Sequence, residues 1–567
     1  MKLIRLTCDQ PTFHPVYFNE SGLTLIIGDS SKEKEGSSNG VGKTLVLGLV
    51  HHCLGANADK KLSSTVPDWW FSLLFSHNGT EYLVSRTGNG KKVLLNNKPI
   101  SLKAYKELLD KCGIFNLNNN IPYLSFRSLF KRFSRYTRDD CISPARTKKE
   151  QDFDALLRTA FLLGIDHTLI LSKKNNKREL DKVSQSLKNW QQDDVLKDMF
   201  RAGSQPKVRY EWLEREIPRL QGELNAFQVH EKYRAIEEET NSLTKAVREL
   251  EKNKNIIEFK INNIDKTLLS HPDISRDDLL ELYSGLQDIF KPETLVHFES
   301  VENFHNSLSF NRKKRLENDK VKLLSELETL QFNITETSTL RDSNLQSLHG
   351  KKALDEYAVI ARQLAEFEEE KTRLNDYLNF SANLQEKAQK LRERKVEQDR
   401  LAVDYASTNP LSEYDKIFAE LAEIMYPRVP AGIVLDVNTG DNQIRYDLSI
   451  QIEGDDSDGI NDARILCFDW LVFMFGENHA MNMLWHDNRL FADIDPGVRS
   501  RWFAFVNKSV KLSGKQYIAT LNTENFKAMA ATISEQEMNE LTSQVVLTLR
   551  GDKAENKLLG IQFGSKK

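Results

Sequence analysis

The chain contains 567 residues, of which 28% are charged, and its formal net charge at pH 7 is −3. This near-neutral charge excludes a globally basic nucleic-acid-binding protein, so any contact with DNA has to come from a local patch. The five cysteines are scattered without a CxxC pair, which excludes a disulfide framework and a zinc site of ordinary spacing. The sequence shows neither an apolar signal core nor an apolar run of about 18 residues, so we expect a soluble cytoplasmic protein without a membrane segment.

The first 165 residues are predicted to form a mixed α/β lobe. An apolar run, Leu23 to Ile27, is followed by a glycine-rich loop and by an apolar stretch, Leu45 to Leu54, that is typical of a helix. Further strands are expected at 71–75, 81–86 and 92–95, with a helix over 102–111. The order of strand, glycine-rich loop and helix is the setting that a phosphate-binding loop requires.

This glycine-rich loop carries the most informative motif of the chain. It ends in Gly-Lys-Thr, although Ser37 replaces the first glycine of the usual pattern. Lys43 is expected to neutralise the β- and γ-phosphate oxygens, and the Thr44 hydroxyl to complete the ligand shell of a Mg²⁺ ion. We therefore predict ATP binding by backbone and side-chain groups of Ser38, Asn39, Gly40, Val41, Gly42, Lys43, Thr44 and Leu45.

From residue 166 to 405 the sequence becomes rich in Glu, Lys, Leu, Asn and Gln, and apolar residues repeat at steps of four and three. Such spacing predicts a coiled coil. We expect an ascending segment at 166–270, a tip or elbow at 271–311, and a descending segment at 312–405 that pairs antiparallel with the first. The alternative is a globular helical bundle. Joints are expected at Pro218, at 228–232 and near Gly350.

From residue 406 to 567 a mixed pattern returns, which predicts a second α/β lobe. Strands are expected at 433–437, 446–452, 481–485, 516–521, 545–549 and 558–563, and helices at 463–475 and 498–512. The strand at 481–485 is soon followed by Asp487, which is the expected place of a Walker B aspartate that holds Mg²⁺ beside Thr44. Asn522 ends the next strand, where a polar group could reach the γ-phosphate.

A short loop before the 463–475 helix contains Ser457 and Gly459. In the order signature loop, Walker B strand and switch strand, these residues stand where a second head would present a Ser and a Gly to the γ-phosphate. Taken alone, the Ser-Asp-Gly sequence is a common turn. The predicted fold class is therefore α/β: a P-loop ATPase head of the ABC type, assembled from both lobes, with an inserted antiparallel coiled-coil arm.

The chain resembles SMC/RecN-type ABC ATPases, and more narrowly the bacterial YydD-like family with its conserved C-terminal domain. The resemblance is carried by 39–44, 125–129, 301–305, 311–312, 457–460, 467–469, 486–487, 495–496, 516–518 and 557–561. It implies a head that forms a homodimer around ATP, with Lys43 of one chain facing Ser457 of the other. It also implies separately encoded partner or effector subunits and a role in anti-phage or mobile-element conflict systems.

Two positions depart from that pattern. Asn488 stands where such heads carry the glutamate that aligns the attacking water, and Asn522 stands at the switch histidine. We expect Lys43, Asp487, Asn488 and Asn522 to be the catalytic group, with hydrolysis that is slow or depends on a partner. The leading hypothesis is an SMC-like ATPase that couples nucleotide state to DNA or to an effector. The alternative is a nucleotide-gated scaffold with little hydrolysis of its own.

The densest basic run of the chain lies at 131–138 and has aromatic residues interleaved. As a DNA-backbone contact it would make binding depend on salt. The alternative is a solvated helix face or a strut against the acidic arm. The residues predicted to touch DNA are Lys131, Arg132, Arg135 and Arg138.

Overall fold

The computed structural model describes most of the chain. The residues that it describes are 1–29, 41–117, 121–135, 137–147, 150–192, 205–226, 231–269, 292–347 and 352–562.

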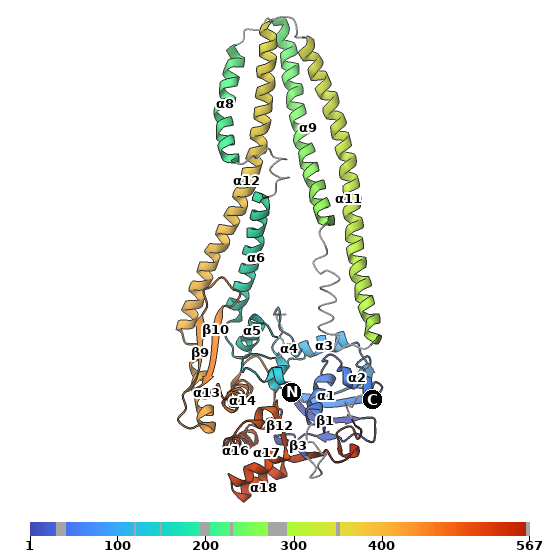
Figure 1. The fold of residues 1–567 in the computed structure, drawn as a ribbon, viewed down its shortest axis with the longest axis vertical. Coiled ribbons are helices and arrows are strands. Elements are labelled where there is room, and N and C mark those ends of the chain that lie inside the picture. Colours follow the sequence, from blue (N-terminus) through green and yellow to red (C-terminus); the bar gives the residue numbers. More distant parts are fainter. Residues whose placement is uncertain are drawn as a thin grey trace. The chain divides into compact units, whose positions relative to one another are not determined.

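The chain divides into two compact units. The head unit joins the two ends of the sequence, Met1–Lys177 and Arg394–Lys567, and the arm unit is Arg178–Glu393. The N- and C-terminal segments therefore build one unit, and the helical middle of the sequence is inserted between them (Figure 1). No helix in the described ranges is both long and apolar enough to cross a membrane.

A five-stranded parallel sheet organises the head unit. Its strand order is β13-β3-β12-β11-β8, and both halves of the sequence contribute strands. The bounds are β3 Gly22–Asp29, β8 Ser134–Arg135, β11 Met483–His486, β12 Gln516–Asn522 and β13 Val545–Arg550. All but the last residue of β3 are buried, as expected for a parallel strand that is covered on both faces. Because the strands are parallel, the carboxyl ends of β3, β12 and β11 meet at one edge of the sheet.

Two antiparallel sheets complete the head unit. The larger has the order β2-β1-β4-β5-β6-β7 and the smaller is the hairpin β9-β10. Their bounds are β1 Lys2–Cys8, β2 Val16–Tyr17, β4 Trp70–His77, β5 Thr80–Thr87, β6 Val93–Leu95, β7 Lys98–Pro99, β9 Ala431–Val437 and β10 Tyr446–Ile452. The alternating burial along β4 matches a strand with one face on the core and one face outward.

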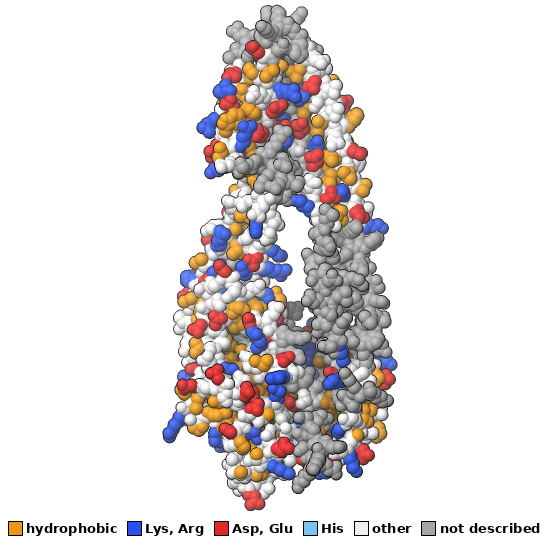
Figure 2. Space-filling view, viewed as in Figure 1, with side chains coloured by type: hydrophobic (Ala, Val, Ile, Leu, Met, Phe, Trp, Pro, Cys, Tyr) orange, Lys and Arg blue, Asp and Glu red, His pale blue; other side chains and the backbone are white. Residues whose placement is uncertain are grey.

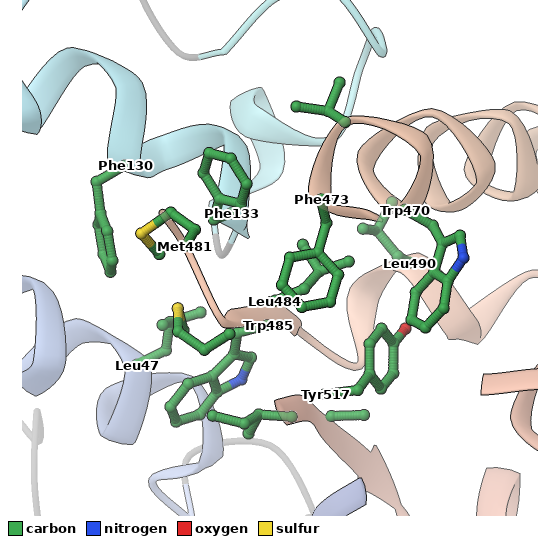
Figure 3. Packing of buried hydrophobic residues seen from close by; sticks show 14 of the residues in the cluster. Leu47, Phe130, Phe133, Trp470, Phe473, Met481, Leu484, Trp485, Leu490 and Tyr517 are labelled. Atoms are coloured by element: carbon green, nitrogen blue, oxygen red, sulfur yellow. The ribbon is translucent and has the colours of Figure 1, made fainter. Parts of the chain in front are cut away.

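Helices cover the parallel sheet, and one hydrophobic core runs through the head unit. The head helices are α1 Lys43–Cys53, α2 Lys60–Thr65, α3 Leu102–Lys111, α4 Phe126–Phe130, α5 Asp152–Leu162, α13 Ser412–Met425, α14 Asp458–Phe475, α15 Arg489–Ala492, α16 Pro496–Ser513, α17 Thr523–Ala528 and α18 Glu535–Ser543. Around β11, Leu484 and Trp485 pack among side chains of α1, α4 and α14 (Figure 3). The N-terminal and C-terminal segments thus share one core.

The arm unit is built from long helices. They are α8 Pro206–Ala226, α9 Glu231–Leu269 and α11 Pro292–Ser347, together with most of α6 His167–Gln192 and α12 Lys352–Ser407. Helices α9 and α11 lie side by side, and Lys320 of α11 pairs with Asp265 of α9 at 2.5 Å. Apolar clusters join α6 to α12, through Val183 and Leu391, and α8 to α12, through Leu213 and Leu374.

Several predicted elements are confirmed, and others are wrong. The helix 102–111 and the strand 446–452 have the predicted bounds. The described residues of the predicted ascending segment form α6, α8 and α9, and α8 continues through Pro218, where a joint was expected. Residues 271–291 of the predicted tip, 271–311, lie outside the described residues, and α11 begins at Pro292 within it.

The predicted strand at 558–563 is also wrong. The described residues 558–562 belong to no strand and turn back at Gly560, which has a φ of +66° and donates its N–H to the Lys557 carbonyl. The apolar pair Leu558 and Leu559 is buried without belonging to a sheet.

Candidate nucleotide site

The described part of the predicted phosphate-binding motif lies at the carboxyl edge of the parallel sheet, at the start of α1. Ser38, Asn39 and Gly40 lie outside the described residues, whereas Val41 to Leu45 are described. Lys43 is the first residue of α1, Thr44 is exposed, and Leu45 is half-buried against the core. The amino end of α1 therefore carries both the lysine and the hydroxyl of the motif, and anions are favoured at such a helix end.

The backbone before α1 is held by the C-terminal segment. Gly42 has a φ of +110°, a backbone conformation that residues with a side chain rarely adopt. A Cβ there would also lie 2.5 Å from Leu558 Cβ. The Leu558 N–H donates to the Val41 carbonyl at 3.1 Å. Residues more than 500 positions apart in the sequence thus fix the path of the loop as it enters the helix.

The Lys43 ammonium group lies against the end of β12. Its Nζ donates to Asn522 Oδ1 at 2.5 Å, and Gly28 leaves room for the side chain, because a Cβ at Gly28 would overlap it. The side chain is 7% exposed. Burial lowers the pKa of Lys43, and the negative charges of Asp487 and Glu524 oppose this shift. An anionic phosphate beside this lysine would compensate for the burial of its charge.

Asp487 follows β11 directly and faces the Thr44 hydroxyl. Thr44 Oγ1 lies 3.3 and 3.2 Å from its two carboxylate oxygens, and Thr520 Oγ1 donates to Oδ1 at 2.6 Å. Burial raises the pKa of this carboxyl, and the Thr520 and Thr44 hydrogen bonds counteract the rise. One carboxylate and one hydroxyl at this separation suit Mg²⁺, which takes few protein ligands and completes its shell with water and phosphate oxygens. When bound, the ion would neutralise phosphate charge.

Asn488 joins the ends of β11 and β12. Its backbone N–H donates to Thr520 Oγ1 at 2.9 Å, and its Oδ1 accepts from the Asn522 N–H at 2.7 Å. Hydrogen bonds thus connect all four predicted catalytic residues, Lys43, Asp487, Asn488 and Asn522, with Thr520 as the link between Asp487 and Asn488. The sequence had not singled out Thr520, although its place two residues before Asn522 on the switch strand puts it on the same face of β12.

The signature-like residues lie at the start of α14. Ser457 is the N-cap position and is exposed, without a capping hydrogen bond from its side chain. Gly459 is buried, and a Cβ there would lie 2.5 Å from the Asp493 carbonyl oxygen, so the site has no room for a side chain. The hydrogen bonds that join the other predicted site residues do not extend to Ser457 within the described part of this one chain.

The predicted DNA contacts at Arg132 and Arg135 are wrong, because both side chains are buried. Arg132 pairs with Glu150 at 2.9 Å. Arg135 is 0% exposed, forms a two-pronged pair with Asp469 at 2.6 and 2.8 Å, and donates to four backbone carbonyls. Lys131 is half-buried and Arg138 is exposed. On the face shown in Figure 2, basic and acidic side chains are interspersed over the head unit.

Asp469 is the centre of a buried network that the sequence did not reveal. Burial would raise the pKa of Asp469, but Arg135 and His486 hold it below its usual range. His486 Nε2 lies 3.3 Å from Asp469, and its Nδ1 lies 2.7 Å from the Tyr517 hydroxyl. Since His486 directly precedes Asp487, the network fixes the end of β11 to α14, β12 and β8.

The head unit is a mixed α/β structure with a parallel sheet, and long helices are inserted in its sequence. Helix α1 begins with the Lys-Thr pair of the motif, and an aspartate follows β11, the second strand from β3 in the sheet. Residues 421–563 match a family described as an uncharacterised protein conserved in bacteria (DUF2326). No curated protein matches the chain.

Three solved structures show a low similarity to the chain. One is the Smc head domain with a coiled coil and joint from Pyrococcus yayanosii, with 14% identity, a TM-score of 0.35 and coverage of 94% of both chains. Another is the Pyrococcus furiosus Smc head domain with an extended coiled coil, bound to the C-terminal domain of ScpA (10% identity, TM-score 0.31, 94% and 91% covered). The third is an SmcHead bound to the C-winged helix domain of ScpA (8% identity, TM-score 0.32, 94% and 92% covered).

Proposed function

We propose that this protein is an SMC-like ATPase whose heads dimerise around Mg-ATP and transmit the nucleotide state to DNA or to a partner effector. The observation that carries the proposal is the convergence of Lys43, Thr44, Asp487 and Asn522 at one edge of the sheet. A buried lysine on an exposed helix start, a magnesium-type pair of oxygens and a switch-strand amide are together suited to a triphosphate.

The first experiment is steady-state Mg-ATP hydrolysis by the wild type and the Lys43→Ala variant, with and without linear DNA. We expect turnover that Lys43→Ala abolishes, because that change removes the cation from the phosphates. Lys511→Ala is a matched control, since Lys511 is a half-exposed lysine paired with Glu540 on the surface. Equal turnover in the wild type and Lys43→Ala would refute the proposal.

Dimerisation around ATP is supported by the exposure of Ser457. An exposed helix start that is not connected to the phosphate site of its own chain is open to a second copy. We expect Mg-ATP to increase the mass measured by light scattering to that of a dimer, and Ser457→Arg to prevent the increase without reducing ATP binding. A mass that stays unchanged with nucleotide would contradict this part of the proposal.

DNA contact is retained only for Lys131 and Arg138, since the other two basic residues are internal. Stimulation of turnover by linear DNA that weakens with salt and in the Lys131→Ala, Arg138→Ala double variant would support it.

The role in anti-phage defence, together with separately encoded effector subunits, is part of the proposal. Loss of phage resistance in cells that carry the Lys43→Ala variant of an intact system would support that role.

The second candidate function is a nucleotide-gated scaffold that binds ATP with little hydrolysis. The observation that favours it is Asn488, an amide where a water-aligning acid is expected, with its Oδ1 engaged by the Asn522 N–H. ATP would then act by shifting the equilibrium between free and docked heads. Asn488→Glu should raise turnover in such a protein, and tight ATP binding without turnover in the wild type would favour it.

A further inference from the structure

The candidate site lacks a carboxylate at the position after Asp487, so any water-aligning acid has to come from elsewhere. Asp487 itself is engaged by Thr44 and Thr520. Asp493 contacts Gly459 through its backbone, and its charge acts on Asp462. The charge of Asp495 acts on Tyr426 and Arg499. Neither of these two acids acts on the lysine of the site.

Glu524 occupies a different place. It lies in the first turn of α17, two residues after Asn522, whose Oδ1 accepts the Lys43 hydrogen bond. Strand β12 pairs with β3 on one side and β11 on the other. The turn that follows β12 is therefore flanked by the carboxyl end of β3 and by the strand that ends before Asp487.

The side chain of Glu524 is exposed, and its charge acts on Lys43. Among the acids of the described chain, Asp487 and Glu524 are the two whose negative charges raise the pKa of Lys43. The same turn also contacts Asn488, which stands where the water-aligning glutamate is expected, because Asn525 Nδ2 lies 3.5 Å from Asn488 Oδ1. An exposed carboxylate on the turn after β12 has access to water, and its charge acts on the lysine that is proposed to hold the γ-phosphate.

We propose that Glu524 is the carboxylate that orients and deprotonates the attacking water, in place of the glutamate missing at Asn488. This inference rests on the proposed ATPase function. In the step, the water oxygen forms a bond to the γ-phosphorus while the bond from that phosphorus to the β–γ bridging oxygen breaks. The water proton passes to Glu524 and then to solvent, and the products are ADP and inorganic phosphate.

The test compares Glu524→Gln with wild type in two measurements on the full-length chain. One is Mg-ATP turnover, and the other is binding of radiolabelled Mg-ATP by equilibrium dialysis. Glutamine keeps the size and the hydrogen-bonding edge but cannot accept a proton, so we expect turnover to fall by about 100-fold or more, as for loss of a general base. Binding should stay within about two-fold of wild type, because Glu524 contributes no cation or backbone N–H to the phosphates.

Glu535→Gln is the matched control, since Glu535 is also an exposed acid in the first turn of a short helix, α18. Its turnover should match wild type. Glu524→Asp, which shortens the side chain by one methylene, should retain binding and lose most turnover, whereas a purely structural role would tolerate both changes.

The outcomes separate the inference from the proposed function. Wild-type turnover in Glu524→Gln overturns the inference alone. A wild-type chain that binds Mg-ATP without turnover overturns the inference and favours the nucleotide-gated scaffold. A chain that binds no Mg-ATP overturns the proposed function itself.

Discussion

Replacing Asp469 by alanine tests whether the buried network around Arg135 holds the head unit together. Asp469 lies on α14, Arg135 ends β8, and both side chains are almost completely buried. Alanine would remove the only carboxylate that faces Arg135 among the described hydrogen bonds and would leave the guanidinium buried. It would also leave His486 Nε2 without its acceptor.

The expected cost follows from these two losses. Removing one partner of a buried ion pair typically costs about 3–5 kcal/mol. Arg135 keeps its bonds to the carbonyls of residues 140, 143, 144 and 146, which places its share at the lower end of that range. The unsatisfied His486 nitrogen adds about 1–3 kcal/mol. We therefore expect Asp469→Ala to destabilise the head unit by about 4 kcal/mol, a large part of the stability of a typical domain.

The assay is urea unfolding followed by tryptophan fluorescence, to which Trp470, Trp485 and Trp502 of the head core contribute. Glu413→Ala is the control, because Glu413 forms an exposed pair with Lys416 at 2.8 Å and such pairs contribute about 0–1 kcal/mol. The urea midpoint should fall clearly for Asp469→Ala and stay nearly constant for Glu413→Ala. Equal midpoints for the two variants would refute the reasoning that the buried pair stabilises the head unit. Arg135 would then again be a candidate for contact with DNA.

Three further predictions concern the surroundings of the site. Gly459→Ala should reduce head stability and ATP-driven dimerisation, because the new Cβ would collide with the Asp493 carbonyl; normal dimer mass and melting temperature would contradict this. Burial and the nearby Asp493 charge raise the pKa of Asp462 to about 7, so its contribution to stability is present below about pH 4 and is lost as the pH rises through 7. Asp462→Asn should therefore stabilise the chain relative to wild type at pH 8 more than at pH 5 in urea unfolding, and a constant difference would contradict the raised pKa. Leu558→Ala should weaken Mg-ATP binding in equilibrium dialysis, because it opens a cavity behind Gly42, and unchanged affinity would show that the C-terminal segment does not support the loop.

The parts of the fold that the sequence predicted are those with a strong local signal. The strand at 446–452 alternates regularly, and the helix at 102–111 has a serine cap and one apolar face, so each has a period that identifies it. The wrong strand at 558–563 has a short apolar run, which does not distinguish a strand from a buried turn. Its course depends on contacts with Thr12 and Val41, which lie at the other end of the sequence.

The candidate site shows the same division. Lys43, Thr44 and Asp487 were predicted because their motifs combine a residue type with a position after a strand. The basic run at 131–138 has charge but no such context, and charge alone does not distinguish a surface arginine from one that is buried and paired. Arg135 meets Asp469 across 334 positions of sequence, so no local pattern identifies the pair.

The two asparagines of the site are best understood together. In the described structure the Asn522 side-chain oxygen accepts from Lys43, and the Asn488 side-chain oxygen accepts from the Asn522 N–H. Both amide oxygens are thus engaged by the protein, and an uncharged amide cannot take a proton from water in any case. Asn488 therefore sets the position of the switch strand rather than of the nucleophile. On the proposed function, we therefore expect hydrolysis to depend on Glu524, an exposed carboxylate in the first turn of α17, and ATP binding to be independent of it.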